Sequence, residues 1–167
     1  YKSETKLGYY KVEIFKAYSP YYFDYKEKLL CIVSAMNLVK LLTVESQSNV
    51  NVFNLIGDLY SIINIDDWVK EYIFWELKLL EIVGFNLELN KIAKYEVINN
   101  EKKYFVGSNS EKKYIPNFLI DRDEKKLDKK NLSKGLKLVG DFLEKNVLKP
   151  NNIGYPNSRL EFVNLFK

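Results

Sequence analysis

The clearest structural signal in this chain is the segment Trp68-Val-Lys-Glu-Tyr-Ile-Phe-Trp-Glu-Leu-Lys-Leu-Leu-Glu-Ile-Val-Gly-Phe85. Its apolar side chains recur at helical spacing in two adjacent stripes, so little polar surface is left around the helix that they predict. A helix that is apolar over most of its girth is normally enclosed by other helices. Asp66 and Asp67 offer N-cap oxygens, and Gly84 offers the left-handed residue that stops a helix. We therefore predict a buried central helix over residues 66–83.

Apolar residues at spacings of three and four predict further helices on both sides of this stretch. Before it, one helix ends near Leu42 and a second ends near Ile63; their predicted buried residues are Tyr25, Leu29, Ile32, Met36 and Val39, then Val52, Phe53, Ile56, Leu59, Tyr60 and Ile63. After it, a long helix ends before Pro150 and a short one follows Pro156; their predicted buried residues are Leu132, Leu136, Val139, Leu143 and Val147, then Leu160, Val163 and Phe166.

Residues 95–115 have a different pattern, in which β-branched and aromatic residues alternate with lysines. Two turn signals, Asn99-Asn100 and Gly107-Ser-Asn-Ser110, divide the segment. We read it as a small β meander. The predicted fold class is therefore mainly α: a helical bundle with a small β meander insertion.

The composition excludes several classes of protein. The 167 residues contain one cysteine, Cys31, and no histidine, which rules out an internal disulfide framework and removes the commonest metal ligand and general base. We predict no cofactor and no enzymatic activity. The chain has no long uncharged apolar run and no leader, so we expect a cytoplasmic protein without a membrane partner.

The net charge of +4 is unevenly distributed along the chain. Residues 29–98 hold five basic residues against nine acids, whereas residues 99–137 hold eleven against six. A regional excess of positive charge is typical of surfaces that attract nucleic acid.

Three segments in order resemble the bacterial RecO family. Trp75-Glu-Leu-Lys-Leu-Leu-Glu-Ile-Val-Gly-Phe85 resembles its aromatic-Glu-Leu and Gly-aromatic motif, Leu7-Gly-Tyr-Tyr-Lys-Val-Glu13 looks like the closing strand of its N-terminal OB domain, and Gly135-Leu-Lys-Leu-Val-Gly-Asp-Phe-Leu-Glu-Lys-Asn-Val-Leu148 looks like its late helix. The resemblance implies four parts: a remnant strand of a truncated OB domain at 1–17, a helical domain at 18–92, the meander with a charged loop at 93–130, and C-terminal helices at 131–167 that pack on the helical domain.

The family resemblance also implies a function and its partners. It implies a mediator of DNA repair and homologous recombination that binds single- and double-stranded DNA, anneals strands, binds the C-terminal tail of single-stranded-DNA-binding protein and helps RecR to load RecA. Many members hold the small subdomain with zinc on paired cysteines. Here Ile92 and Tyr95 occupy the first pair of positions, so we predict no zinc.

The candidate DNA-binding residues are lysines and rings of the meander and the following charged loop. Lysines that meet phosphates beside rings that stack on bases hold single strands without sequence preference. Solvated lysines guarding a sheet edge, and an ordinary exposed loop, are the alternative readings. The candidates are Lys102, Lys103, Tyr104, Lys112, Lys113, Lys125, Lys126, Lys129 and Lys130, with Phe105 and Tyr114 as further rings.

Partner-binding and structural roles are predicted on the central helix. Relatives place arginines just before the aromatic-Glu-Leu motif for the acidic tail; here Lys70 and Lys78 are the possible substitutes. Glu76 falls on the apolar face, so we expect it to be structural, either capping another helix or paired with a lysine or with Arg159. Trp75, Gly84 and Phe85 are the other predicted structural residues.

Two alternatives to the mediator remain open. The first is a helical protein-protein interaction adaptor that does not bind DNA. The second is an enzyme that holds Mg²⁺ at residues 121–124, although no companion base or phosphate loop accompanies those acids.

Overall fold

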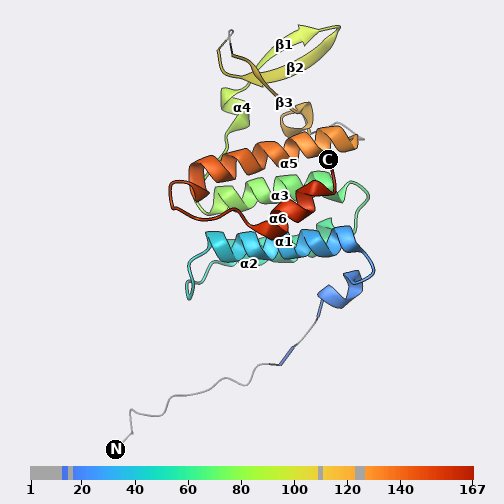
Figure 1. Cartoon of the computed structure of the whole chain (residues 1–167), viewed down its shortest axis with the longest axis vertical. Coiled ribbons are helices and arrows are strands. Elements are labelled where there is room, and N and C mark those ends of the chain that lie inside the picture. The colour runs from blue at the N-terminus through green and yellow to red at the C-terminus, as the bar shows by residue number, and fades with distance from the viewer. Residues whose placement is uncertain (1–12, 15–16, 109–110, 123–126) are drawn as a thin grey trace, which may run out of the picture.

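The computed structural model describes residues 13–14, 17–108, 111–122 and 127–167, and it is mainly helical (Figure 1). The α-helices are α1 (Lys26–Leu42), α2 (Val50–Ile62), α3 (Trp68–Ile82), α4 (Leu89–Ile92), α5 (Lys129–Leu143) and α6 (Asn157–Asn164). The strands β1 (Lys94–Ile98), β2 (Glu101–Val106) and β3 (Lys113–Ile115) form one antiparallel sheet in that order. Short 3-10 helices cover Ser19–Tyr22 and Asn117–Leu119. The predicted fold class, mainly α with a small β insertion, is confirmed.

The predicted remnant strand at 1–17 lies almost entirely outside the described residues. None of the helices in the described part of the chain is long and apolar enough to cross a membrane.

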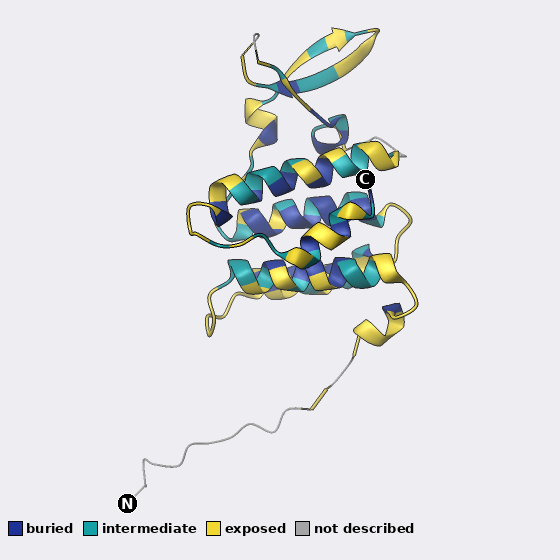
Figure 2. Ribbon diagram, viewed as in Figure 1, coloured by how far each residue is buried: buried dark blue, intermediate teal, exposed yellow. Residues whose placement is uncertain are grey.

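Helix α3 lies at the centre of the bundle, between α5 on one side and α1 and α2 on the other (Figures 1 and 2). Only Lys78 and Glu81 of its residues are exposed. Trp75 is 2% exposed, and its indole Nε1 donates a 2.6 Å hydrogen bond to the Leu55 carbonyl of α2. The central position expected of this sequence is therefore confirmed.

The two ends of α3 differ in how they are capped. Asp67 is the N-cap residue, but its side chain forms no capping hydrogen bond, so the predicted cap contributes only a favourable charge near the helix start. At the other end Gly84 has φ +91°, and the Phe85 N–H donates to the Leu80 carbonyl at 2.8 Å. This is the Schellman arrangement, in which a glycine ends the helix at low conformational cost.

Helices α1 and α2 bury only some of the residues that were predicted for their buried faces. In α1 the buried apolar residues are Cys31, Ile32, Ala35 and Leu38, whereas Tyr25 is 58% exposed. At α2 the predicted residues Val52, Leu59 and Ile63 are buried, whereas Phe53 is 75% exposed. Helix α1 contacts α6 and α3, and α2 contacts α3, so tertiary contacts and not spacing alone decide which large apolar residues are covered.

Helix α5 packs against α3 at a glycine. A Cβ at Gly135 would lie 2.6 Å from Phe118 Cζ and 3.1 Å from Ile73 Cδ1, so only glycine permits this approach without a shift. The helix continues as a π-helical turn over Glu144–Leu148, which the sequence did not predict. In α6 the buried residues are Arg159 and Phe162, and Leu160, expected to be buried, is 45% exposed.

The sheet stands beyond α5, at the end of the molecule opposite α1 and α2 (Figure 1). Its register pairs Tyr95 with Tyr104 and Phe105 with Tyr114. Asn99 and Asn100, both with positive φ, make the tight turn between β1 and β2. The meander and its first turn signal are confirmed.

Candidate nucleic-acid interface

A cleft of about 1140 Å³ lies between the sheet and helix α5. Five lysines and two acids line it, namely Lys102, Lys103, Lys113, Lys134, Lys137, Glu101 and Asp141. Its other lining residues include the apolar side chains of Ile115, Pro116 and Leu138. We call this site the basic cleft. Lysines on two facing walls above a partly apolar floor are the chemistry that a phosphate backbone with attached bases requires.

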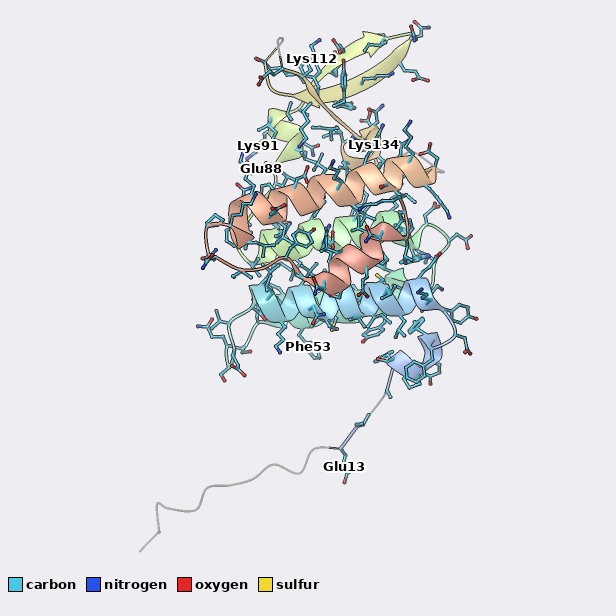
Figure 3. The ribbon with its side chains drawn as sticks, viewed as in Figure 1. Glu13, Phe53, Glu88, Lys91, Lys112 and Lys134 are labelled. Carbon is cyan, nitrogen blue, oxygen red and sulfur yellow. The ribbon has the colours of Figure 1, made fainter. Side chains whose placement is uncertain are left out.

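The helix wall of the basic cleft carries Lys134 and Lys137, both exposed. Figure 3 shows Lys134 on the side of α5 that faces the sheet. These two residues were missed among the candidate sites, yet a signal for them exists. Lys130, Lys134 and Lys137 are spaced by four and three residues, which places them on one face of a helix. Lys130 lies on that face in the first turn of α5.

The sheet wall of the basic cleft combines β3 with the part of β2 that β3 does not cover. Strand β3 pairs only with Tyr104–Val106, so Glu101–Lys103 form an open edge. The Asn117 side chain donates a 2.6 Å hydrogen bond to the Lys102 carbonyl at this edge. Among the described residues, Lys102, Lys103, Lys134 and Lys137 form no ion pair, so their charges are available to an anion.

The four predicted meander lysines do not form one patch, because the sheet register divides them. Residues directly opposite each other in an antiparallel pair share a face. Glu96 opposite Lys103 and Phe105 opposite Tyr114 therefore define an outer face, while Lys102 and Lys113 belong to the inner face with Tyr104 and Ile115. The basic cleft extends around the open edge of β2, so Lys103 of the outer face lines it together with Lys102 of the inner face. Lys112 belongs to the outer face, since its ammonium lies 4.8 Å from the Phe105 ring centre.

Lys112 is engaged on the outer face by Glu96. The Glu96 carboxylate accepts hydrogen bonds from Lys112 Nζ and, at 2.6 Å, from the Tyr114 hydroxyl. The hydrogen bond from Lys112 lowers the pKa of Glu96 below its ordinary value, and the hydrogen bond from Tyr114 has a smaller effect in the same direction. Lys112 is thus already neutralised and, unlike Lys102 and Lys113, does not line the basic cleft.

The aromatic residues of the meander are less available than the sequence suggested. Phe105 is only 4% exposed, so its ring is covered. Tyr104 is half-buried, and its hydroxyl donates a 3.1 Å hydrogen bond to Asp121, which raises the pKa of Tyr104. Tyr95 and Tyr114 are 62% and 50% exposed. Stacking on Phe105 is therefore excluded in this arrangement.

The lysines of the charged loop fall in two groups. Lys125 and Lys126 lie outside the described residues, as do Asp123 and Glu124. Lys129 and Lys130 are exposed in the first turn of α5, where the Asp128 side chain caps the helix by accepting from the Asn131 N–H at 2.7 Å. This start of α5 aligns the later lysines with the basic cleft.

The two predicted partner-binding lysines lie on α3, away from the basic cleft. Lys70 Nζ donates a 2.9 Å hydrogen bond to the Arg122 carbonyl, and the Arg122 guanidinium lies 4.8 Å from the Phe74 ring centre. Lys78 forms an exposed ion pair with Glu81 at 2.9 Å. The Arg122 guanidinium therefore places a positive charge beside Phe74, which is the residue just before the aromatic-Glu-Leu motif on α3.

Glu76 and Arg159 form a buried ion pair between α3 and α6. Arg159 Nε and Nη2 lie 2.8 and 2.7 Å from the two Glu76 carboxylate oxygens, and the side chains are 1% and 2% exposed. Arg159 also donates to the Leu136 carbonyl of α5 at 2.9 Å. Burial alone would lower the pKa of Arg159, but the Glu76 carboxylate more than offsets this and raises it. The sequence left several possible partners open for Glu76, and in the structure the partner is Arg159.

The positions that hold zinc ligands in many relatives do not suit a metal here. Ile92 ends α4 and is 53% exposed, and Tyr95 lies on β1. Cys31 is buried in α1, far from the sheet in the fold. Among the described residues, no group of three or more His, Cys, Asp or Glu side chains is placed to hold a metal ion. These residues do not fit a zinc site.

Comparisons with known proteins give one consistent family. The family model described as "Recombination protein O C terminal" matches residues 26–152. A DNA repair protein RecO of Rickettsia canadensis is 31% identical over 106 residues, covering 62% of this chain and 42% of the relative. Those of Rhodospirillum centenum and Ehrlichia chaffeensis are 22% and 24% identical, covering 97% and 96% of this chain and 70% and 73% of the relatives.

The matched regions leave a substantial part of each relative outside the comparison, and more than half of the Rickettsia canadensis protein. No solved structure gives a significant match. The family match nevertheless covers well over half of this chain, from the start of α1 to beyond the end of α5. The chain therefore belongs to the RecO C-terminal family.

Proposed function

We propose that this chain acts in DNA repair and homologous recombination as a mediator of RecO type, and that it holds DNA in the basic cleft. The observation that carries the proposal is the convergence of Lys102 and Lys103 from the sheet with Lys134 and Lys137 from α5. The family of the chain supports the repair role. The proposal is one of binding and not of turnover, because Glu76, the one buried acid among the described residues, is fully engaged by Arg159.

The proposed ligands, activities and partners are taken from the family to which the chain belongs. Single- and double-stranded DNA are the proposed ligands, annealing and RecA loading with RecR the proposed activities, and the tail of single-stranded-DNA-binding protein a further partner. For that acidic tail we propose the flank of α3 at Lys70 and Lys78, supported by the guanidinium of Arg122 over Phe74. A cation beside an aromatic surface suits an acidic peptide that carries an aromatic residue.

The binding of a fluorescent single strand at several salt concentrations tests the DNA proposal. Electrostatic binding should weaken steeply with salt, with a slope of log K against log salt of about −0.7 for each phosphate contact. The double variant Lys134→Glu/Lys137→Glu should abolish most of the binding. The matched control is Lys26→Glu/Lys40→Glu on α1, which changes the net charge equally but lies at the far side of the bundle from the sheet.

If the wild-type chain, tested alone and joined to the N-terminal region of a relative, binds no strand even at low salt, the DNA proposal fails. If the α1 variant weakens binding as much as the α5 variant, DNA is held by overall charge and not by the basic cleft.

A protein-interaction adaptor is the second candidate. The exposed apolar side chains of Val50 and Phe53 on α2, 65% and 75% exposed, favour it, because apolar side chains that gather on a surface mark contact sites. Figure 3 shows Phe53 on the side of the bundle away from the sheet. Loss of partner binding in Phe53→Ser, with no strand binding by the wild type at any salt concentration, would favour the adaptor.

A further inference from the structure

The basic cleft has an acid at one end of its helix wall, one turn beyond the last lysine. Asp141 follows Lys137 by four residues on α5, so the two side chains lie on the same side of the helix, one turn apart. Asp141 lines the cleft together with Lys134 and Lys137. A carboxylate in this position repels any phosphate that approaches this end of the cleft.

Asp141 also engages a lysine from the opposite wall. Lys113 Nζ, on β3, lies 3.4 Å from Asp141 Oδ2, and the two side chains are 66% and 43% exposed. Within the described parts of the chain, this is the one ion pair that joins the sheet to α5. A pair so exposed is weak and exchanges readily with other ions. A strand phosphate in the cleft offers Lys113 an alternative anion.

We propose that Asp141 is a counter-charge that limits the affinity of the basic cleft by occupying Lys113 until a phosphate displaces it. The inference rests on the proposed function of the cleft. In the free protein Lys113 is neutralised and the Asp141 end is closed to phosphate. In the complex Lys113 turns from the carboxylate to the strand, and Asp141 loses its partner. Asp141 thus lowers the affinity of the cleft for the strand and makes the strand easier to release.

A purely structural role for Asp141 predicts the opposite result. If the Lys113–Asp141 pair served only to hold the sheet against α5, its loss would loosen the cleft and weaken strand binding. If Asp141 competes with phosphate, its loss frees Lys113 and tightens strand binding. The sign of the change in affinity therefore separates the two roles.

The experiment compares Asp141→Asn with a matched control, Glu144→Gln. Glu144 also pairs with an exposed lysine, Lys149, at 3.0 Å, and its side chain has the same 43% exposure, but it does not line the cleft. Asp141→Asn should bind a fluorescent single strand about 2- to 5-fold more tightly at low salt, the range of an exposed ion pair. Its salt slope should steepen by about 0.7, because Lys113 becomes one further phosphate contact. Glu144→Gln should change neither quantity by a comparable amount.

A double-mutant cycle with Lys113→Gln identifies the lysine that is released. Lys113→Gln should weaken binding little when Asp141 is present, since the carboxylate already neutralises this lysine. In the Asp141→Asn background the same change should cancel most of the gain in affinity and return the salt slope to its wild-type value. Thermal unfolding of each variant checks that the fold is retained.

Three outcomes would overturn the inference: an Asp141→Asn affinity equal to that of Glu144→Gln, a weaker affinity, or a gain that Lys113→Gln does not remove. Each of these leaves the DNA proposal standing as long as the wild-type chain binds and Lys134→Glu/Lys137→Glu does not. Absence of wild-type binding would instead remove the proposed function itself.

Discussion

The bundle and the basic cleft each contain an acid–base pair that joins distant elements, and the two pairs differ in almost every physical respect. Glu76 and Arg159 are 2% and 1% exposed, with two short hydrogen bonds between them. Asp141 and Lys113 are 43% and 66% exposed, at 3.4 Å. Breaking a buried pair leaves a charge without water, whereas breaking an exposed pair leaves two hydrated charges.

This difference indicates how the molecule divides its tasks. Among the described residues of the bundle, the buried charged side chains are Glu76 and Arg159, and this pair fixes how α6 sits on α3 and α5. The sheet and α5 keep most of their charges in water, where they remain free to exchange partners. We therefore expect variants of the bundle to change stability and variants of the cleft to change binding.

The largest loss of stability should come from Trp75→Ala. Removing a 2% exposed indole should cost about 3 to 5 kcal/mol of the free energy of unfolding. The Leu55 carbonyl also loses its donor. Denaturant titration measures the loss, and Phe53→Ala, at a 75% exposed aromatic residue, serves as the control with an expected change below about 0.5 kcal/mol. Equal losses in the two variants would show that α3 is not the centre of the bundle.

Arg159→Leu should cost a similar amount, about 3 to 5 kcal/mol, because it leaves the Glu76 carboxylate buried without its partner. Lys113→Leu, which breaks the exposed pair, should cost less than about 1 kcal/mol. The double variant Glu76→Leu/Arg159→Leu should be more stable than Arg159→Leu alone, since no buried charge remains. A double variant less stable than the single one would show that the pair contributes more than mutual neutralisation.

Gly135→Ala should destabilise the bundle by about 1 to 3 kcal/mol, although alanine normally favours a helix over glycine. The added methyl group would collide with Phe118 and Ile73. Gly57→Ala in α2 is the control: no atom lies within 4 Å of its Cβ position, so alanine should stabilise by up to about 1 kcal/mol. Opposite signs in chemical denaturation are expected. The same sign would mean that α5 does not approach α3 at Gly135.

The smallest effect concerns the outer face of the sheet. Because hydrogen bonds from Lys112 and Tyr114 lower the pKa of Glu96 below 4.5, its contribution to stability is present above pH 4.5 and is lost as the pH falls through the lowered value. An NMR titration of the Glu96 carboxyl should show a midpoint below 4.5, and Lys112→Gln should raise it. A midpoint at or above 4.5 in the wild type would contradict the contact.

Sequence patterns predicted the bundle better than the cleft, for physical reasons. The apolar girth of 68–83 and the left-handed Gly84 are local properties, and they placed α3 and its end correctly. The exposure of Phe53 depends on which elements cover α2, and no local pattern in the sequence determines that.

The cleft depends on long-range contacts of the same kind. The meander lysines were foreseen as one patch, but strand register alone decides that Lys112 faces Glu96 while Lys113 faces Asp141. The helix wall could have been found, since Lys130, Lys134 and Lys137 share a helical face in the sequence itself. That this helix wall lies close to the open edge of β2 could not have been found from the sequence.

Photo-cross-linking from single cysteines tests directly whether the basic cleft holds the strand. Lys137→Cys places a thiol-linked photoreactive group in the cleft, and Lys40→Cys places it on α1 as the control. The native Cys31 should stay unlabelled, because it is fully buried and burial raises the pKa of its thiol. We predict capture of a single strand from position 137 and not from position 40, with loss of capture at high salt. Capture from position 40 but not from position 137 would show that the strand is held on the bundle and not in the basic cleft.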